Sequence, residues 1–420
     1  MEKRMLSIKP LFLLITANLL GMLIVIMNKD IQSENIVYLC ALMCLINVIA
    51  YLVINLCALG DGYLFIIISM LSSIGIIMQT RINSDNGIRQ MMLYLAGVFC
   101  YFITIIVYKV FHKYWNRLTL VYFGVSILSF ILTALLGAVK NGSKNWIIIG
   151  GISIQPSEFI RILFVLSLAA VLTNGKFKKN KDQVEDKKMK RLRLGIVAII
   201  AYINAFCLLL QREWGIAVLF FAIYLSYLFI YGDSKLFFSA NIFAALSAGF
   251  IGVKFMSHIQ VRVSTWLDPF ADATGKGYQI LQSMFAISAG GFAGSGIGHG
   301  APYFIPIVSS DFIFSAICEE MGVLGGIAVL LLYFVLVYRG FKIALSSTND
   351  FNKAVSIGLS VMLGVQTFII VGGVVKLIPL TGITLPFISY GGSSMITTFI
   401  ALGILQAISS MKGEVTDEIE

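Results

Sequence analysis

Long apolar runs recur along the whole chain and constrain its fold more than any other feature. With 58% hydrophobic and 12% charged residues, the chain offers repeated runs of about 17–25 residues, the length that spans a bilayer as a helix. We predict an all-α polytopic membrane protein with about twelve transmembrane helices. These lie near residues 10–28, 36–59, 63–79, 91–111, 118–139, 158–174, 194–210, 215–231, 236–254, 311–338, 354–376 and 394–410.

Lysine and arginine sort the connections between these runs into two sets. The N-terminal tail and the segments 112–117, 176–193 and 339–353 are basic and fall on one side if the helices alternate. By the positive-inside rule that side is the cytoplasm, so both termini are predicted to be cytoplasmic in a multi-pass protein of the cytoplasmic membrane. We attribute the basic segment 176–193 to topology and to anionic membrane lipids, and we expect no nucleic acid partner.

The same alternation places three unusual segments on the outer face, at Lys140–Pro156, at Met256–Ser310 and at Leu377–Ser393. The second is predicted to be a large extracellular loop. The six cysteines lie inside apolar runs without the close spacing of metal or redox sites, so we expect neither disulfides nor a structural metal.

The first outer segment runs into Gln155-Pro-Ser-Glu158 at the start of a span. Proline is tolerated in a first helical turn, where a carboxylate also faces the positive end of the helix dipole. Glu158 and Arg161 stand three residues apart and can pair on one helical face. A helix cap with an interfacial ion pair and a functional pair are both open interpretations.

The second segment carries two aspartates with different surroundings. Asp268 precedes a proline and suits a turn. Asp272, flanked by Arg262 and Lys276, could act as a general base toward a sugar hydroxyl. A glycine-rich run from residue 290 to 300 follows, without phosphate-loop spacing, and allows either ligand contact or a tight fold.

Two adjacent carboxylates, Glu319 and Glu320, lie inside the apolar run that begins near Asp311. Both cannot face lipid at tolerable free energy, so at least one should face a polar cavity or a cation. The third segment, 376–394, contains two prolines and many hydroxyl groups. It is typical of irregular backbone that survives at membrane depth by lining a cavity.

Four motifs in this order resemble the SEDS family (shape, elongation, division and sporulation), which includes FtsW, RodA and SpoVE. They are Gln155-Pro-Ser-Glu158, Gly277-Tyr-Gln279 followed by Gly290-Gly291, Asp311-Phe-Ile-Phe with Glu319-Glu320, and Pro386-Phe-Ile-Ser-Tyr-Gly-Gly-Ser-Ser394. The resemblance covers about residues 61–411. It implies a ten-helix catalytic core there, two additional helices in residues 1–60 and a cytoplasmic tail at 412–420.

The resemblance further implies a peptidoglycan glycosyltransferase that polymerises lipid II at the outer face of the bacterial cytoplasmic membrane, for elongation, division or sporulation. A class B penicillin-binding protein is its expected partner. Alignment on Gly277–Gln279 places the family's essential aspartate at Asp272 rather than Asp268. Three positions depart from the family pattern: Arg161 for a usual lysine, Glu213 for aspartate and Ile370 for asparagine.

We therefore predict Asp272 as the catalytic base or its orienter, acting directly or through a divalent cation such as magnesium or manganese. Supporting roles are expected for Glu158, Arg161, Asp311, Glu319 and Glu320. Substrate contacts are expected from Arg262, Lys276, Lys140 and Lys144, which could hold the diphosphate, and from Gln155, Gln279, Ser389 and Ser393.

Two other functions remain open from the residues. A flippase moving lipid II outward would also need many spans and intramembrane carboxylates, with Glu319 or Glu320 as a proton-coupled site. Internal repeats would favour it, and the two halves show none. A non-catalytic scaffold for a penicillin-binding protein would tolerate substitution of the motif residues.

Overall fold

The protein is described by a computed structural model that covers all residues except 1–7, 28–32, 141–142, 151, 174–186 and 412–420. Twelve helices in these residues are long and apolar enough to cross a membrane, which confirms the prediction. They are α1 (Ile8–Met27), α2 (Ser33–Leu56), α3 (Gly62–Ile82), α4 (Ser84–Val110), α5 (Thr119–Leu136), α6 (Pro156–Thr173), α7 (Lys187–Leu210), α8 (Trp214–Tyr231), α9 (Lys235–Phe255), α12 (Ile313–Ser346), α13 (Asp350–Val374) and α14 (Gly392–Ser410).

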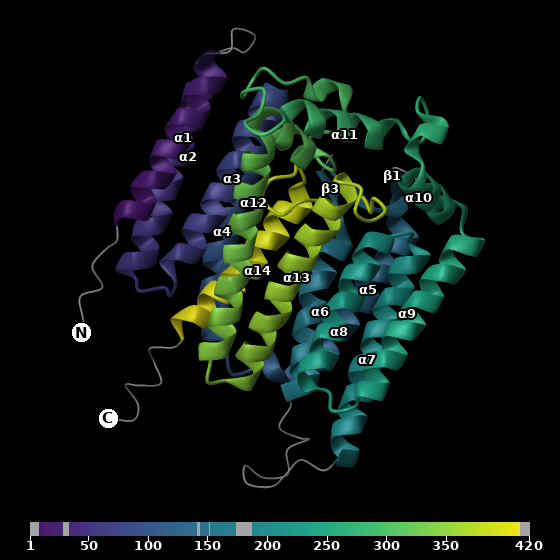
Figure 1. The fold of residues 1–420 in the computed structure, drawn as a ribbon. Coiled ribbons are helices and arrows are strands. Elements are labelled where there is room, and N and C mark those ends of the chain that lie inside the picture. Colours follow the sequence, from purple (N-terminus) through teal and green to yellow (C-terminus); the bar gives the residue numbers. More distant parts are fainter. Residues whose placement is uncertain (1–7, 28–32, 141–142, 151, 174–186, 412–420) are drawn as a thin grey trace.

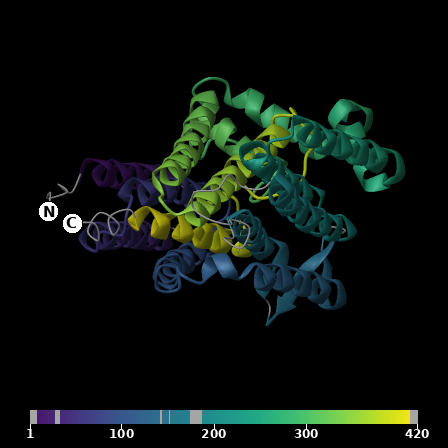
Figure 2. The ribbon, with the colours of Figure 1, turned by 90° about the horizontal axis from the view of Figure 1, so that it is seen from below.

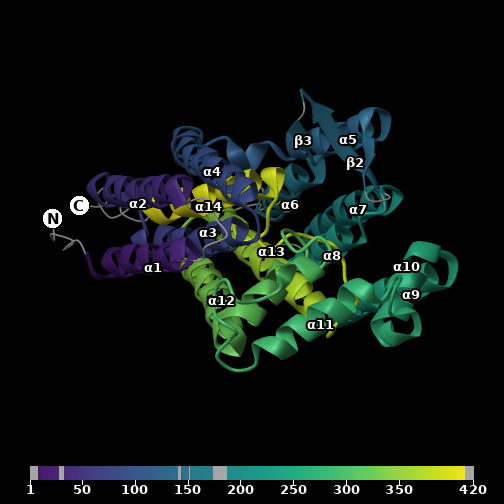
Figure 3. The ribbon, with the colours of Figure 1, turned by 90° about the horizontal axis from the view of Figure 1, so that it is seen from above.

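The helices form one bundle with buried helices at its centre. Most residues of α3, α6, α13 and α14 are buried, whereas α9 is mostly exposed. Seen from below, α14 runs through the middle of the bundle (Figure 2). From above, α1 and α2 lie at one edge and α9 at the opposite edge (Figure 3). The proposed division into residues 1–60, 61–411 and 412–420 stays a prediction, and the last of these ranges lies outside the described residues.

One end of the bundle, here called the α11 end, gathers all three segments that the sequence singled out (Figure 1). Residues 256–310 lie there, next to the connection between α13 and α14 and the strands that follow α5. The predicted large extracellular loop is not confirmed as such, and most of this segment is helical. It holds α10 (Ser257–Leu267), η3 (Pro269–Asp272), α11 (Tyr278–Gly290) and η4 (Pro302–Phe304), while a further short helix, η1 (Trp115–Arg117), lies between α4 and α5.

A small antiparallel sheet interrupts the all-α architecture. Its strands β1 (Ala138–Lys140), β2 (Ser143–Ile149) and β3 (Ile152–Ile154) pair in sequence order. Three consecutive isoleucines in β2 suit a strand because β-branched side chains pack well on a pleated surface. The sheet leads directly into Pro156, the first residue of α6.

Helix α12 is broken at Gly322, whose φ of 68° and ψ of −173° are accessible to glycine but not to residues with a Cβ. The glycine-rich run packs against this break. Its backbone N–H groups at Ser295 and Gly296 donate to the carbonyls of Glu319 and Glu320, at 3.0 Å each. Because the break frees backbone groups inside the bundle, these bonds satisfy them without water.

Candidate functional site

Hydrogen bonds join the three segments that the sequence singled out into one structure at the α11 end. The backbone N–H of Gln155 donates to Ser393 Oγ at 3.0 Å. Ser389 Oγ donates to the carbonyl of Ser310 at 2.6 Å, and the N–H of Tyr390 donates to the carbonyl of Ser309 at 2.8 Å. The segment between α13 and α14, together with the first turn of α14, therefore connects the start of α6 with the start of α12, and both Ser389 and Ser393 take part in these connections.

Asp272 lies in an exposed turn between α10 and α11. Its Oδ2 accepts a hydrogen bond from the backbone N–H of Lys276 at 3.0 Å, and its carbonyl accepts from the N–H of Gly277 at 2.9 Å. Within the described residues no donor reaches its Oδ1. One carboxylate oxygen thus holds the turn, and the other is left for a ligand.

Asp268, four residues earlier, has a purely local role. Its Oδ1 accepts the N–H of Phe270 at 3.1 Å and caps the short helix η3. This is the turn-forming role expected for an aspartate before proline. The two aspartates therefore differ in position, since Asp268 caps η3 from the residue before it and Asp272 is its last residue.

The remaining predicted contacts near Asp272 are less defined. The side chain of Lys276 is exposed on the same turn, and Gln279 lies in the first turn of α11, half-buried. Lys140 and Lys144 belong to strands of the sheet, but their side chains lie outside the described residues.

Arg262 and Asp311 face each other across Gly382. A Cβ on that glycine would lie 3.5 Å from Asp311 Oδ2 and 3.8 Å from Arg262 Nη2. Arg262 also donates to the carbonyls of Leu380 and Thr381, at 3.0 and 2.8 Å. Burial raises the pKa of Asp311, while the hydroxyl of Ser310 and the charge of Arg262 partly offset the shift. Arg262 therefore holds the segment between α13 and α14 through two hydrogen bonds, and it is also exposed at the protein surface.

Glu158 and Arg161 form the pair expected from their spacing, but deep in the bundle. Arg161 Nη2 lies 2.5 Å from Glu158 Oε2, and both residues are buried. Arg161 also donates to Gln366 Oε1 at 2.8 Å, and to the hydroxyls of Thr397 at 2.9 Å and Thr398 at 3.2 Å. The pair therefore ties α6 to α13 and α14 below the α11 end.

Glu213, noted in the sequence only as a departure from the family pattern, is part of this framework. It directly precedes α8 and accepts hydrogen bonds on Oε1 from Gln155 Nε2, at 2.8 Å, and from Asn145 Nδ2. Burial raises its pKa, and these hydrogen bonds partly counter the shift. Its partners are more than fifty residues away in the sequence. The available sequence signal was therefore the presence of an acidic residue directly before a predicted helix.

The intramembrane carboxylates clamp the glycine-rich run. Glu319 Oε1 accepts the N–H of Ala301 at 2.7 Å, and Glu320 Oε2 accepts the N–H of Gly298 at 3.1 Å. Glu320 also forms an ion pair with Arg81 of α3 at 3.3 Å. The expected cationic partner is therefore present.

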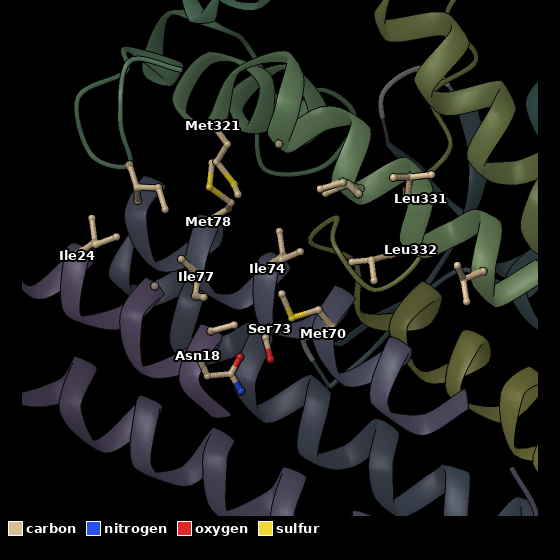
Figure 4. A pocket seen from close by; sticks show the side chains of 17 residues that line it. Asn18, Ile24, Met70, Ser73, Ile74, Ile77, Met78, Met321, Leu331 and Leu332 are labelled. Atoms are coloured by element: carbon tan, nitrogen blue, oxygen red, sulfur yellow. The ribbon is translucent and has the colours of Figure 1, made fainter. Parts of the chain in front are cut away.

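An apolar cavity of about 520 Å³ lies between α1, α3 and α12 (Figure 4). Asn18 and Ser73 are the polar side chains in a wall made mostly of methionine, isoleucine and leucine. Figure 3 shows α1 at the edge of the bundle opposite α10. This cavity is therefore separate from the turn that holds Asp272.

No cluster of three acidic, histidine or cysteine side chains capable of holding a metal occurs in the part of the chain that the structure describes. Magnesium is often held by one or two carboxylates together with substrate phosphates and water. Asp272 Oδ1, which meets no donor from the described residues, fits that mode, in which the substrate supplies most of the ligands.

Known proteins resemble this chain over most of its length. Residues 47–414 match the family model FTSW_RODA_SPOVE, described as a cell cycle protein. Peptidoglycan glycosyltransferase RodA of Mycobacterium tuberculosis is 36% identical over 369 residues, covering 83% of this chain and 78% of that protein. Stage V sporulation protein E of Bacillus subtilis is 32% identical over 365 residues, covering 83% and 96%. A solved chain from a peptidoglycan synthase complex shares the fold, with a TM-score of 0.70 at 24% identity over 84% of this chain and 99% of that chain.

Proposed function

Because the chain belongs to the FtsW, RodA and SpoVE family of cell cycle proteins, we propose that it polymerises lipid II with Asp272 as the catalytic carboxylate. It is a multi-pass membrane enzyme, a peptidoglycan glycosyltransferase. The observation that supports Asp272 is its exposed turn at the α11 end, where Oδ1 meets no donor from the described residues.

The reaction needs a base near a sugar hydroxyl. Asp272 Oδ1 takes the proton of the attacking hydroxyl, whose oxygen bonds to the anomeric carbon of a second lipid-linked sugar. The bond from that carbon to the diphosphate breaks, and the lipid diphosphate leaves with the electron pair. Both lipid tails remain in the membrane throughout, so the base has to lie at the bilayer surface.

Charge near the leaving diphosphate comes from basic residues at the α11 end. Arg262 and Lys276 are the described candidates, and Lys140 and Lys144 are candidates from the sequence. In the alternative role, Asp272 would hold a magnesium or manganese ion instead of taking the proton itself, and that ion would supply positive charge at the diphosphate.

We assign the α11 end to the outer face of the cytoplasmic membrane and both termini to the cytoplasm, because of the distribution of lysine and arginine. A class B penicillin-binding protein that cross-links the product is the proposed partner. The similar solved chain comes from a peptidoglycan synthase complex that coordinates polymerisation with crosslinking, which supports this assignment.

The carboxylates inside α12 do not suit a proton-coupled flippase. Glu320 is paired with Arg81, and Glu319 is bonded to the backbone of Ala301. A transport site needs a carboxylate that changes partners during the cycle, whereas these two hold a loop against a broken helix.

Asp272→Asn tests the proposal, with Asp268→Asn as the matched control. Asparagine can still accept the N–H of Lys276 at position 272, and it is a good helix cap at position 268. We expect purified Asp272→Asn to polymerise lipid II about 10²–10⁴-fold more slowly, the usual contribution of a general base. The control should stay near wild type, and undiminished glycan synthesis by Asp272→Asn would remove Asp272 from the mechanism.

A further inference from the structure

A second cavity, of about 510 Å³, opens between α5, α7 and β1 at the α11 end. Its apolar walls include Ile131 and Ala134 of α5, Val139 of β1, and Leu210 of α7. These four side chains are exposed, so the cavity opens at the surface of the bundle. In a bilayer that surface meets lipid chains.

The polar end of this cavity is formed by two consecutive residues after α7. Gln211 is buried, and its Nε2 donates to the carbonyl of Phe130 at 3.2 Å, which fastens the end of α7 to α5. Arg212 is exposed and has a φ of 62°, a left-handed conformation that is uncommon for residues with a side chain. The turn thus keeps a guanidinium at the edge of the apolar cavity.

A second arginine, Arg262 of α10, contributes positive charge near Arg212, and His258 of α10 is close to both. The ring of His258 lies 6.1 Å from that of Trp214, two residues after Arg212. Burial and then the charges of Arg212 and Arg262 lower the pKa of His258. The neighbouring Glu213 directs its side chain to the amides of Gln155 and Asn145 and forms no ion pair with Arg212 among the described residues. Two arginines therefore lie near His258.

We propose that this cavity binds the first part of the lipid tail of a polyprenyl diphosphate-linked sugar, with its diphosphate on Arg212. The inference rests on the proposed function and deepens it. Polymerisation joins two lipid-linked molecules, and each lipid tail needs its own binding site on the membrane-facing surface of the protein. It adds a contact with substrate that the motifs do not include.

The size of the cavity selects a hydrocarbon chain over a helix of a partner protein. A helix about 10 Å wide fills roughly 80 Å³ for each ångström of length, so 510 Å³ holds little more than one turn. A flexible hydrocarbon chain can adapt its shape to the same space. The two arginines match the charge of a diphosphate better than that of a phospholipid with one phosphate.

The direct test uses full-length protein in phosphatidylethanolamine nanodiscs and a farnesyl diphosphate probe with a benzophenone on its tail. We expect photolabelling of residues 127–134 and 207–212, reduced about five- to tenfold by Arg212→Gln, the loss expected for one hydrogen bond with a net contribution of about 1 kcal/mol. Arg89→Gln, an exposed arginine on α4, is the matched control. Labelling unchanged by Arg212→Gln would overturn the assignment, as would displacement by phosphatidylglycerol as strong as by unlabelled farnesyl diphosphate.

A second variant tests the cavity without changing charge. Ala134→Phe fills it, and Ala244→Phe places the same side chain on the exposed face of α9 as a control. We expect Ala134→Phe and Arg212→Gln each to raise the lipid II concentration for half-maximal rate about five- to tenfold, with little change in the maximal rate. Unchanged values in an active enzyme would contradict this inference alone. A wild-type enzyme that makes no glycan would instead contradict the proposed function.

Discussion

Asp272 and Glu158 are both acidic residues of the family motifs, but their surroundings are opposite. Asp272 is exposed on a turn, where one oxygen has no donor among the described residues. Glu158 is buried and pairs with Arg161 at 2.5 Å. Reaction with a substrate needs an accessible oxygen, whereas a buried pair with further hydrogen bonds to two other helices fixes the positions of helices. The first carboxylate therefore suits chemistry and the second suits the framework beneath it.

The largest expected effect on stability comes from breaking the buried pair. Arg161→Ala leaves Glu158 charged and unpaired in the bundle, along with the amide of Gln366. We expect a loss of about 3–5 kcal/mol in the free energy of unfolding, measured by reversible unfolding in SDS mixed micelles. Asp272→Asn should leave that free energy within about 0.5 kcal/mol of wild type. A stable Arg161→Ala enzyme that had lost only its activity would reverse the two roles.

The sequence predicts features that depend on contacts between residues close in the chain, and it misses features that depend on contacts between distant residues. The spans and the pairing of Glu158 with Arg161 depend on local periodicity and spacing, and both predictions are confirmed. The helical character of residues 257–290 was missed because short polar helices lack a long apolar period. The break at Gly322 depends on bonds with a run about thirty residues earlier, which no local pattern encodes.

The same limit applies to the site. Asp272 was placed by its position before Gly277, and its role stays a prediction. The partners of Arg161 on α13 and α14, and those of Glu213 in the sheet, are distant in the sequence and required the fold. Spacing predicts which side chains share a helix face, but not which helix that face meets.

A smaller effect should follow from Arg161→Lys, which retains the charge common in the family. Arg161 uses both terminal nitrogens, Nη1 toward Gln366 and Nη2 toward Glu158 and the hydroxyl of Thr397. A single ammonium cannot reproduce that planar fork. We expect a loss of about 1–3 kcal/mol, the cost of leaving a buried amide unsatisfied. Equal stability in the same unfolding assay would mean that charge alone, and not bidentate geometry, joins α6 to α13.

The smallest effect concerns Glu213, which is buried like Glu158 but is bonded to amides instead of a cation. Because burial raises its pKa in the folded protein, its protonated form favours folding. That contribution is present below the ordinary pKa of glutamate and is lost as pH rises through the folded value. Glu213→Gln should therefore show a melting temperature that depends less on pH above about 4.5, and should gain relative to wild type toward neutral pH. Melting curves between about pH 4.5 and 8 measure this, with Asp268→Asn as the control. A wild-type stability that rises over that range by an amount abolished in Glu213→Gln would show that the folded protein favours the ionised form of Glu213, and would contradict this prediction.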